Sequence, residues 1–328
     1  MLEKLVLGLG VGLLFGFALQ RGRFCMYTAF RDIVLIKDLT LFRAYLLALL
    51  VQMVLVHLLS QWGVISFGVP PFFWLAAITG GLIFGVGMTL AGGCSSSSFY
   101  RVGEGMVGSF VVVLTFIIFA TATSNGVLRP LARALYTYNV DMGENSATVS
   151  HLLGLPDSLF ILFLALGGGL WFFWTASPKP ARGWGWRKTG TIIGVIATLA
   201  WFTSALTGRQ YGLSMTGPSS SVLLYLTSGN SGYLDWGTFQ LVGIPIGAFV
   251  AAVWNNEFKW RAPQPKRMML QAVGGAMMGI GAVIARGCNI GNSLTGLGIL
   301  SLTSLVATIF LILGTWGGTY LFFIRQRT

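Results

Sequence analysis

Two stretches decide the fold of this chain: GGLIFGVGMTLAGGCSSSS at residues 80–98 and GGAMMGIGAVIARGCNIGN at residues 274–292. Seven residues of the first recur in the second at the same spacing: Gly80, Gly81, Gly85, Gly87, Ala91, Gly93 and Cys94 match Gly274, Gly275, Gly279, Gly281, Ala285, Gly287 and Cys288. An ungapped match of this kind indicates an internal duplication. Each half of the chain is therefore predicted to place a cysteine at the end of an apolar, glycine-rich helix.

Composition assigns the chain to the membrane. Its 328 residues are 55% apolar and only 9% charged, with a mean hydropathy of +0.76. A soluble protein is about a quarter charged, so we expect an all-α polytopic membrane protein whose spans each need roughly 20 apolar residues. About nine spans are predicted, near residues 4–20, 41–60, 72–92, 105–123, 158–176, 190–207, 236–255, 268–286 and 299–323.

The basic residues of the chain, which carries a net charge of +12, predict its topology. Much of this charge lies in short loops between apolar runs, where positive-inside sorting explains it without nucleic acid. A basic linker at 177–189 separates the predicted halves 1–176 and 190–328. This linker, the loop around Lys259 to Arg267 and the C-terminal tail would share the cytoplasmic side, with the N-terminus and the polar segment 124–157 outside. An odd number of spans between equivalent segments would then invert one half relative to the other, giving two pseudo-symmetric inverted repeats.

Two further turns complete a set of four glycine-rich turns. GLLFGFALQRGRFC at residues 12–25 is a weaker third copy that ends in Cys25, and TGRQYGLSMTGPSSS at residues 207–221 occupies the remaining equivalent place without a cysteine. Irregular backbone at membrane depth is tolerated only where it is buried in protein or lines a wet cavity. We therefore expect the four turns to converge near the membrane centre and to form a pore-like site.

The residue types in these turns favour a sulfur-bearing anion. Arginine suits forked recognition of oxyanions, helix N-termini add N–H donors, and cysteine adds soft sulfur. The predicted pathway residues are Cys25, Cys94, Cys288, Arg23, Arg209, Arg286, Gly93, Ser95, Gly287 and Asn289.

Less specific roles remain open for several of these residues. The arginines could instead set topology or pair with carboxylates such as Asp32, and buried cysteine often serves as a small hydrophobe. Glu104 is expected to pair with Arg101 at a helix end. Lone cysteines without CxxC or Met-rich clusters argue against a metal. No cofactor is expected, and the chain has no Walker-type phosphate loop.

The segment QRGRFC at residues 20–25, the stretch Thr28-Ala29-Phe30-Arg31-Asp32 and the GGC and RGC turns closely resemble the YeeE/YedE family of sulfur-compound transporters. The resemblance implies a pseudo-symmetric helical fold in the bacterial inner membrane that imports thiosulfate, with Cys25, Cys94 and Cys288 along the substrate path. It also implies a separate small sulfur-carrier protein of the TusA/SirA type on the cytoplasmic side.

On this interpretation, neutral thiols hand thiosulfate from one cysteine to the next by weak S–H hydrogen bonds. A membrane sulfurtransferase that forms a cysteine persulfide is a rival hypothesis, but such catalysis needs a base near a cysteine, and neither histidine lies near one in sequence. An enzyme is therefore not expected. Three non-enzymatic functions also stay open: transport of a different sulfur or selenium compound, transport of a soft metal, and simple channel conduction.

Overall fold

The structure is a computed structural model that describes residues 1–140, 147–154, 156–175 and 183–325. The described residues are helical, as predicted, and contain no β-strand. Parts of the predicted segment 124–157 and residues 177–182 of the predicted linker 177–189 lie outside the described residues. The last four residues assigned to that linker are helical, because the next helix begins at Trp186.

The helices occur in two series of the same order, separated by three connecting helices. The first series comprises α1 (Leu2–Arg21), α2 (Met26–Leu35), α3 (Thr40–Gln61), α4 (Trp74–Ala91), α5 (Ser95–Gly103) and α6 (Val107–Ser124). The connection holds α7 (Arg129–Tyr136), α8 (Val149–Leu152) and α9 (Asp157–Trp174). The second series comprises α10 (Trp186–Leu206), α11 (Thr216–Ser228), η1 (Ser231–Tyr233), α12 (Trp236–Trp254), α13 (Pro265–Ile284), η2 (Gly291–Gly296), α14 (Leu302–Thr319) and η3 (Tyr320–Ile324).

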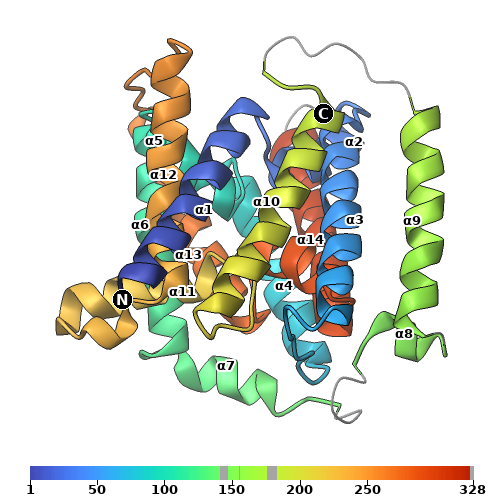
Figure 1. Cartoon of the computed structure of the whole chain (residues 1–328). Helices are drawn as coiled ribbons and strands as arrows, with labels where there is room; N and C mark the ends of the chain where they lie inside the picture. The colour runs from blue at the N-terminus through green and yellow to red at the C-terminus, as the bar shows by residue number, and fades with distance from the viewer. Residues whose placement is uncertain (141–146, 155, 176–182, 326–328) are drawn as a thin grey trace.

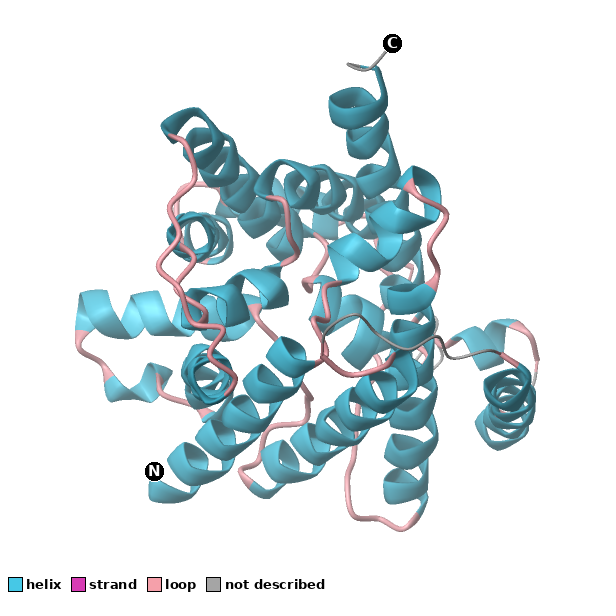
Figure 2. Ribbon diagram, turned by 90° about the horizontal axis from the view of Figure 1, so that it is seen from above, coloured by secondary structure: helices cyan, strands magenta, loops and turns pink. Residues whose placement is uncertain are grey.

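Among the described residues, eight helices are long and apolar enough to cross a membrane, one fewer than predicted. The ninth predicted span corresponds to α9, whose described apolar stretch Asp157–Trp171 is shorter than the others. Both views show α9 standing apart at the edge of the bundle (Figures 1 and 2). This helix belongs to neither series, so the repeated core consists of the eight longer spans.

Exposed lysines mark one end of the bundle. We call "basic end" the end that holds the α12–α13 loop, and "α7 end" the opposite one, which holds the N-terminus and α7 (Figure 1). Lys259 and Lys266 in and beside the α12–α13 loop are exposed. Figure 1 also shows α1 running from the α7 end toward the basic end, whereas α10 runs the opposite way.

Glycines explain how the first and third helices of the two series pair. A methyl group at Gly12 or Gly16 of α1 would collide with backbone oxygens of α12. In the same way, Gly190 and Gly194 of α10 lie against backbone oxygens of α3. Small residues let helices approach this closely. The first helix of each series thus packs against the third helix of the other.

The repeated stretches themselves meet in a reciprocal contact between α4 and α13. Gly80 faces the backbone of Ala285, and its counterpart Gly274 faces the backbone of Ala91, which is the counterpart of Ala285. Such an exchange of partners is what an internal two-fold axis produces, and it supports the inverted repeat, which stays a prediction.

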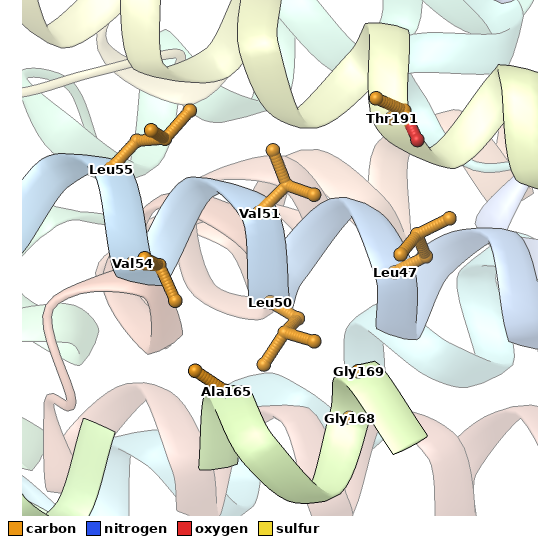
Figure 3. A pocket seen from close by; sticks show the side chains of 9 residues that line it. All are labelled: Leu47, Leu50, Val51, Val54, Leu55, Ala165, Gly168, Gly169 and Thr191. Carbon is orange, nitrogen blue, oxygen red and sulfur yellow. The ribbon is translucent and has the colours of Figure 1, made fainter. Parts of the chain in front are cut away.

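An apolar groove lies between α3, α9 and α10 (Figure 3). It has a volume of about 330 Å³, and Thr191 is the one residue with a polar side chain among those that line it. The groove can accept hydrocarbon from the surrounding lipid but offers almost nothing to an anion. A polar site has to be sought at the four turns.

Candidate functional site

Two of the three cysteines are in direct contact in the interior. The Sγ atoms of Cys25 and Cys94 lie 3.9 Å apart, and both residues are buried. The Cys25 thiol also donates to Ser97 Oγ at 3.2 Å, and the Cys94 thiol lies 3.3 Å from Ser96 Oγ. Each cysteine directly precedes a short helix, α2 or α5. The two turns therefore present their thiols to each other beside hydroxyl groups.

Left-handed backbone positions explain how the turns redirect the chain. Arg23 and Arg286, each two residues before a cysteine, have φ angles of 49° and 59°. Gly92, which ends α4, has a φ of 72°. Residues other than glycine rarely adopt this region, whereas glycine does so at little cost. In each of the three cysteine-bearing turns, a residue in the left-handed conformation thus follows the long helix two positions before the cysteine.

The turn of Cys288 joins this pair through the residue that follows it. Ser95 Oγ donates to Asn289 Oδ1 at 2.7 Å, and Asn289 Nδ2 donates to Met26 Sδ at 3.2 Å. Cys288 is buried as well and accepts a hydrogen bond from the Gly291 N–H at 3.5 Å. Asn289 therefore connects the third cysteine turn to the other two.

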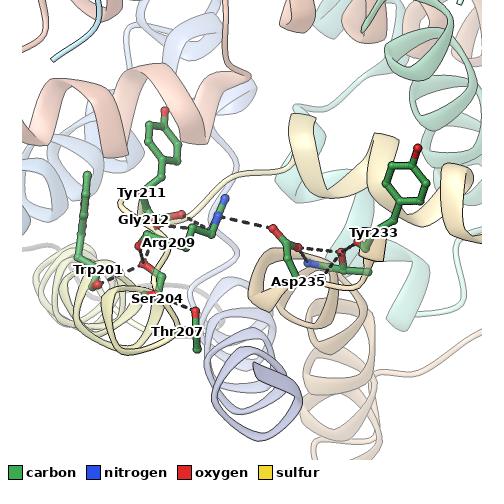
Figure 4. A network of polar contacts seen from close by, with 9 residues as sticks. Trp201, Ser204, Thr207, Arg209, Tyr211, Gly212, Tyr233 and Asp235 are labelled. Carbon is green, nitrogen blue, oxygen red and sulfur yellow. Dashed lines mark hydrogen bonds and ion pairs between the residues drawn. The ribbon is translucent and has the colours of Figure 1, made fainter. Parts of the chain in front are cut away.

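The fourth turn packs on the segment after Cys288. Tyr211 donates its phenol O–H to Gly291 O at 2.9 Å, and Thr295 Oγ1 donates to Leu213 O at 2.7 Å. Ser204 Oγ, at the end of α10, donates to Tyr211 O at 2.7 Å and holds the turn in place (Figure 4). All four turns are thus linked by contacts, so the predicted convergence is confirmed; their depth in a bilayer stays a prediction.

Arg23 does not present a free charge. It forms ion pairs with Glu104 at 2.9 Å and with Glu257 at 2.8 Å. The expected pair of Glu104 with Arg101 is wrong, because the Arg101 guanidinium turns back to donate to Gly92 O at 3.0 Å. Arg23 thus takes the less specific role of pairing with carboxylates, although with different partners from the one suggested.

Asp32, the carboxylate suggested as a partner for the pathway arginines, is occupied elsewhere. It pairs with its neighbour Arg31 at 2.6 Å. The carboxylates that reach Arg23 instead come from the end of α5 and from the α12–α13 loop.

Glu257, at the basic end, has two arginines beside its carboxylate. Burial raises the pKa of its carboxyl, but a 2.7 Å hydrogen bond from Gln20 and the charges of Arg23 and Arg21 outweigh it and hold the pKa below its ordinary value. Arg21 lies 3.5 Å from the same carboxylate. The ionised Glu257 therefore ties the end of α1 to the α12–α13 loop.

Arg209 lies at the α7 end and is only partly neutralised. Its Nε lies 3.8 Å from Asp235 Oδ2 (Figure 4), which is longer than the contacts of Arg23. Its guanidinium stacks over the Trp236 ring, 5.4 Å from the ring centroid. It also donates to Gly212 O at 3.1 Å within its own turn.

Arg286 has no carboxylate partner among the described residues. Its guanidinium stacks over Phe73, 4.4 Å from the ring centroid, and lies 5.3 Å from that of Tyr136. It lines two cavities, of about 590 Å³ and about 210 Å³, which also share Tyr211. The larger one is lined by Arg209 as well. The α7 end thus has a polar cavity in which positive charge is in excess.

Sequence reasoning missed that Arg101, expected to pair with Glu104, instead faces the GGC turn together with Ser97, one helical turn before it on α5. A side chain at Gly93 would meet both Ser97 Oγ and Arg101 Nη1. Ser97 and Arg101 follow the GGC turn and are four residues apart, and residues with this spacing share a helix face. The sequence therefore did hold a signal that the two side chains lie together. A side chain at Gly287 would similarly meet Asn292. Both predicted glycines therefore leave room for polar side chains.

The chain is similar to known membrane transporters along its whole length. The profile of a family described as Sulphur transport matches residues 21–317. The thiosulfate transporter TsuA of Spirochaeta thermophila is 40% identical over 331 residues, covering 97% of this chain and 99% of the relative. The thiosulfate transporter TsuA of Escherichia coli K12 is 34% identical over 346 residues, covering 100% and 97%. The probable transporter YedE of the same organism is 31% identical over 185 residues, covering 55% of this chain and 45% of the relative.

Proposed function

The chain belongs to the Sulphur transport family, and on that premise we propose that it imports thiosulfate across the bacterial inner membrane. It is a multi-pass membrane transporter, not an enzyme, in keeping with its relatives and its apolar helices. The name shared by the two full-length relatives supports thiosulfate as the cargo.

The buried contact between Cys25 and Cys94 is the observation that carries the cysteine relay. Thiosulfate has a terminal sulfur and three oxygens, so it differs from sulfate at a single atom. Thiols beside hydroxyls can hold the terminal sulfur by weak S–H hydrogen bonds and release it again. In our proposal the anion passes from Cys288 to the Cys25–Cys94 pair, with Ser95, Asn289, Gly93 and Gly287 forming the passage around it.

Charge supports the direction of this movement. The cavity at the α7 end, with Arg286 and Arg209, attracts the dianion, whose burial otherwise costs several kcal/mol per charge. At the basic end, Arg23 is held by Glu104 and Glu257. Basic loops face the cytoplasm in bacterial membranes, so the open cavity would face outward and the paired arginine inward. The halves 1–176 and 190–328, joined by the linker 177–189, remain our proposed domain division.

The basic end is also where we place a separate TusA/SirA-like sulfur-carrier protein. Its exposed Lys259, Arg261 and Lys266 would suit a partner surface with acidic groups. A carrier thiol that takes the terminal sulfur of thiosulfate as a persulfide, with sulfite released, would keep the internal concentration of free thiosulfate low.

Reconstitution tests the proposal directly. Proteoliposomes that contain the full-length chain should accumulate labelled thiosulfate, and unlabelled thiosulfate should compete far better than sulfate. Protein-free vesicles are the control. Equal uptake with and without protein would overturn thiosulfate transport, and equal competition by sulfate would overturn recognition of the terminal sulfur.

A further inference from the structure

The turn without a cysteine carries two buried hydroxyls that lack partners. Thr216 and Ser219 lie in the first turn of α11, three residues apart and so on one face. Thr216 is 9% exposed and Ser219 is fully buried. Neither hydroxyl has a hydrogen-bond partner among the described residues. Buried hydroxyls are normally satisfied, so an unsatisfied one calls for an explanation.

Two hydroxyls further along the same helix do have partners. Ser220 Oγ lies 3.2 Å from Ser124 Oγ, and Thr227 Oγ1 donates to the carbonyl of Leu223 at 2.8 Å. The contrast sets Thr216 and Ser219 apart from these hydroxyls of α11.

The N-terminus of α11 is open to an anion. The helix has 13 residues, and its N-cap residue Met215 makes no side-chain capping bond. Open space surrounds the position where Gly217 would carry a side chain. The first N–H groups of a helix carry partial positive charge and bind anions readily. In α11 these are the N–H groups of Thr216 and Gly217, because Pro218 has no N–H and the N–H of Ser219 donates to Met215 O at 3.1 Å.

The same turn faces the cationic cavity. Thr216 and Gly217 line the cavity of about 590 Å³ together with Arg209 and Arg286. A methyl group at Gly291 would lie 3.9 Å from Ser214 Oγ and 4.0 Å from Cys288 Sγ, so Gly291 lies between the turn that precedes α11 and the Cys288 thiol. This hydroxyl-bearing turn and a thiol thus lie on either side of Gly291.

We propose that the first turn of α11 is a binding site for the oxygens of the transported anion, with Thr216 and Ser219 as hydroxyl donors. This inference rests on the proposed function and deepens it. Hydroxyls and helix N–H groups bind the three oxygens, and the terminal sulfur is left for Cys288. The division fits the fourth turn, in which Met215 occupies the N-cap place that Cys25 and Cys94 hold in their own turns and a hydroxyl follows at Thr216.

Uptake kinetics of the full-length chain in proteoliposomes test the site. Thr216→Val keeps the shape of the side chain but removes its hydroxyl, so the KM for thiosulfate should rise about 10-fold, the effect of one lost hydrogen bond to a charged group. Ser219→Ala should act in the same direction. Thr216→Ser restores the hydroxyl and should restore the KM. Thr227→Val, on the same helix, should leave the KM unchanged.

Thermal unfolding in detergent separates binding from a structural role. Without substrate, Thr216→Val should unfold at the wild-type temperature or above it, because it removes an unsatisfied buried group. With thiosulfate, its stabilisation by ligand should be smaller than that of the wild type. An unchanged KM in the Thr216→Val/Ser219→Ala double variant, or a loss of stability without substrate, would overturn the site while thiosulfate import by the wild type stands. Absence of import by the wild type would overturn both proposals.

Discussion

Ser95 Oγ donates a 2.7 Å hydrogen bond to Asn289 Oδ1, and these residues hold the same place in the two repeat copies, 194 positions apart. Each directly follows the cysteine of its own copy, Cys94 or Cys288. A residue that meets its own counterpart lies where an internal two-fold axis would pass. The seam between the halves therefore runs through the polar turns, beside the thiols.

The hydrogen bond between Ser95 and Asn289 predicts that their contributions to stability are coupled. Ser95→Ala and Asn289→Ala should each destabilise the protein by about 1–3 kcal/mol, because each leaves a buried polar partner unsatisfied. The double variant should lose less than the sum, by at least about 0.5 kcal/mol. Chemical unfolding in detergent measures this, with Ser95→Ala combined with Thr227→Val as the additive control. Strict additivity of Ser95→Ala and Asn289→Ala would contradict the contact.

The packing of α1 on α12 predicts opposite effects for two neighbouring glycines. Gly12→Ala forces a methyl group against the α12 backbone and should cost about 1–3 kcal/mol. Gly10, on the same helix, has open space at that position, so Gly10→Ala should be neutral or stabilising by up to about 1 kcal/mol. The thermal unfolding temperatures of the two variants, each compared with the wild type, test this prediction. Similar effects of the two substitutions would show that the helices do not cross at Gly12.

Replacement of the cysteines tests the relay. Cys25→Ser, Cys94→Ser and Cys288→Ser should each lower thiosulfate uptake about 10-fold or more, because a hydroxyl replaces the soft S–H donor. Met53→Leu removes a buried sulfur away from the turns, in a separate apolar cluster, and should leave uptake unchanged. Normal uptake by all three cysteine variants would rule out the relay. Mass spectrometry of the wild type after exposure to thiosulfate should show no added sulfur.

The charge of Arg286 should matter for capture of the anion. Arg286→Gln should raise the KM for thiosulfate about 10-fold and reduce its dependence on ionic strength, because this cation lines the cavity and has no carboxylate partner in the described part of the chain. Arg129→Gln removes an exposed charge from α7 at the same end of the bundle and provides the control. If both substitutions shift the KM equally, the effect is one of general surface potential.

Glu257 predicts an acid-dependent loss of stability. Its folded pKa lies below the ordinary value of 4.5, so its stabilising effect is present above pH 4.5 and is lost as the pH falls through the folded pKa. Glu257→Gln should lower the unfolding temperature at pH 7, and the difference from the wild type should shrink toward about pH 3. Glu3→Gln, an exposed change on α1, should show no such trend. A difference that does not vary with pH would contradict the ion pairs.

Local patterns in the sequence are sufficient to predict the long helices and the four turns. Apolar runs and their length reveal spans, and glycine spacing reveals close helix crossings, because both depend on residues near one another in the chain. The span at α9 is the exception. Its described stretch Asp157–Trp171 is apolar but short, and hydropathy alone does not show that it stands outside the repeated core.

The helical membrane fold, the internal repeat and the cysteine-bearing turns can be inferred from the order of residues alone, since hydropathy and residue spacing are properties of neighbouring residues. Helix packing brings Cys25 to Cys94, pairs Arg23 with Glu104 and Glu257, and leaves Arg286 without a carboxylate partner among the described residues. These contacts join residues far apart in the chain. Which thiols touch and which arginines remain available for an anion therefore depend on how the helices pack.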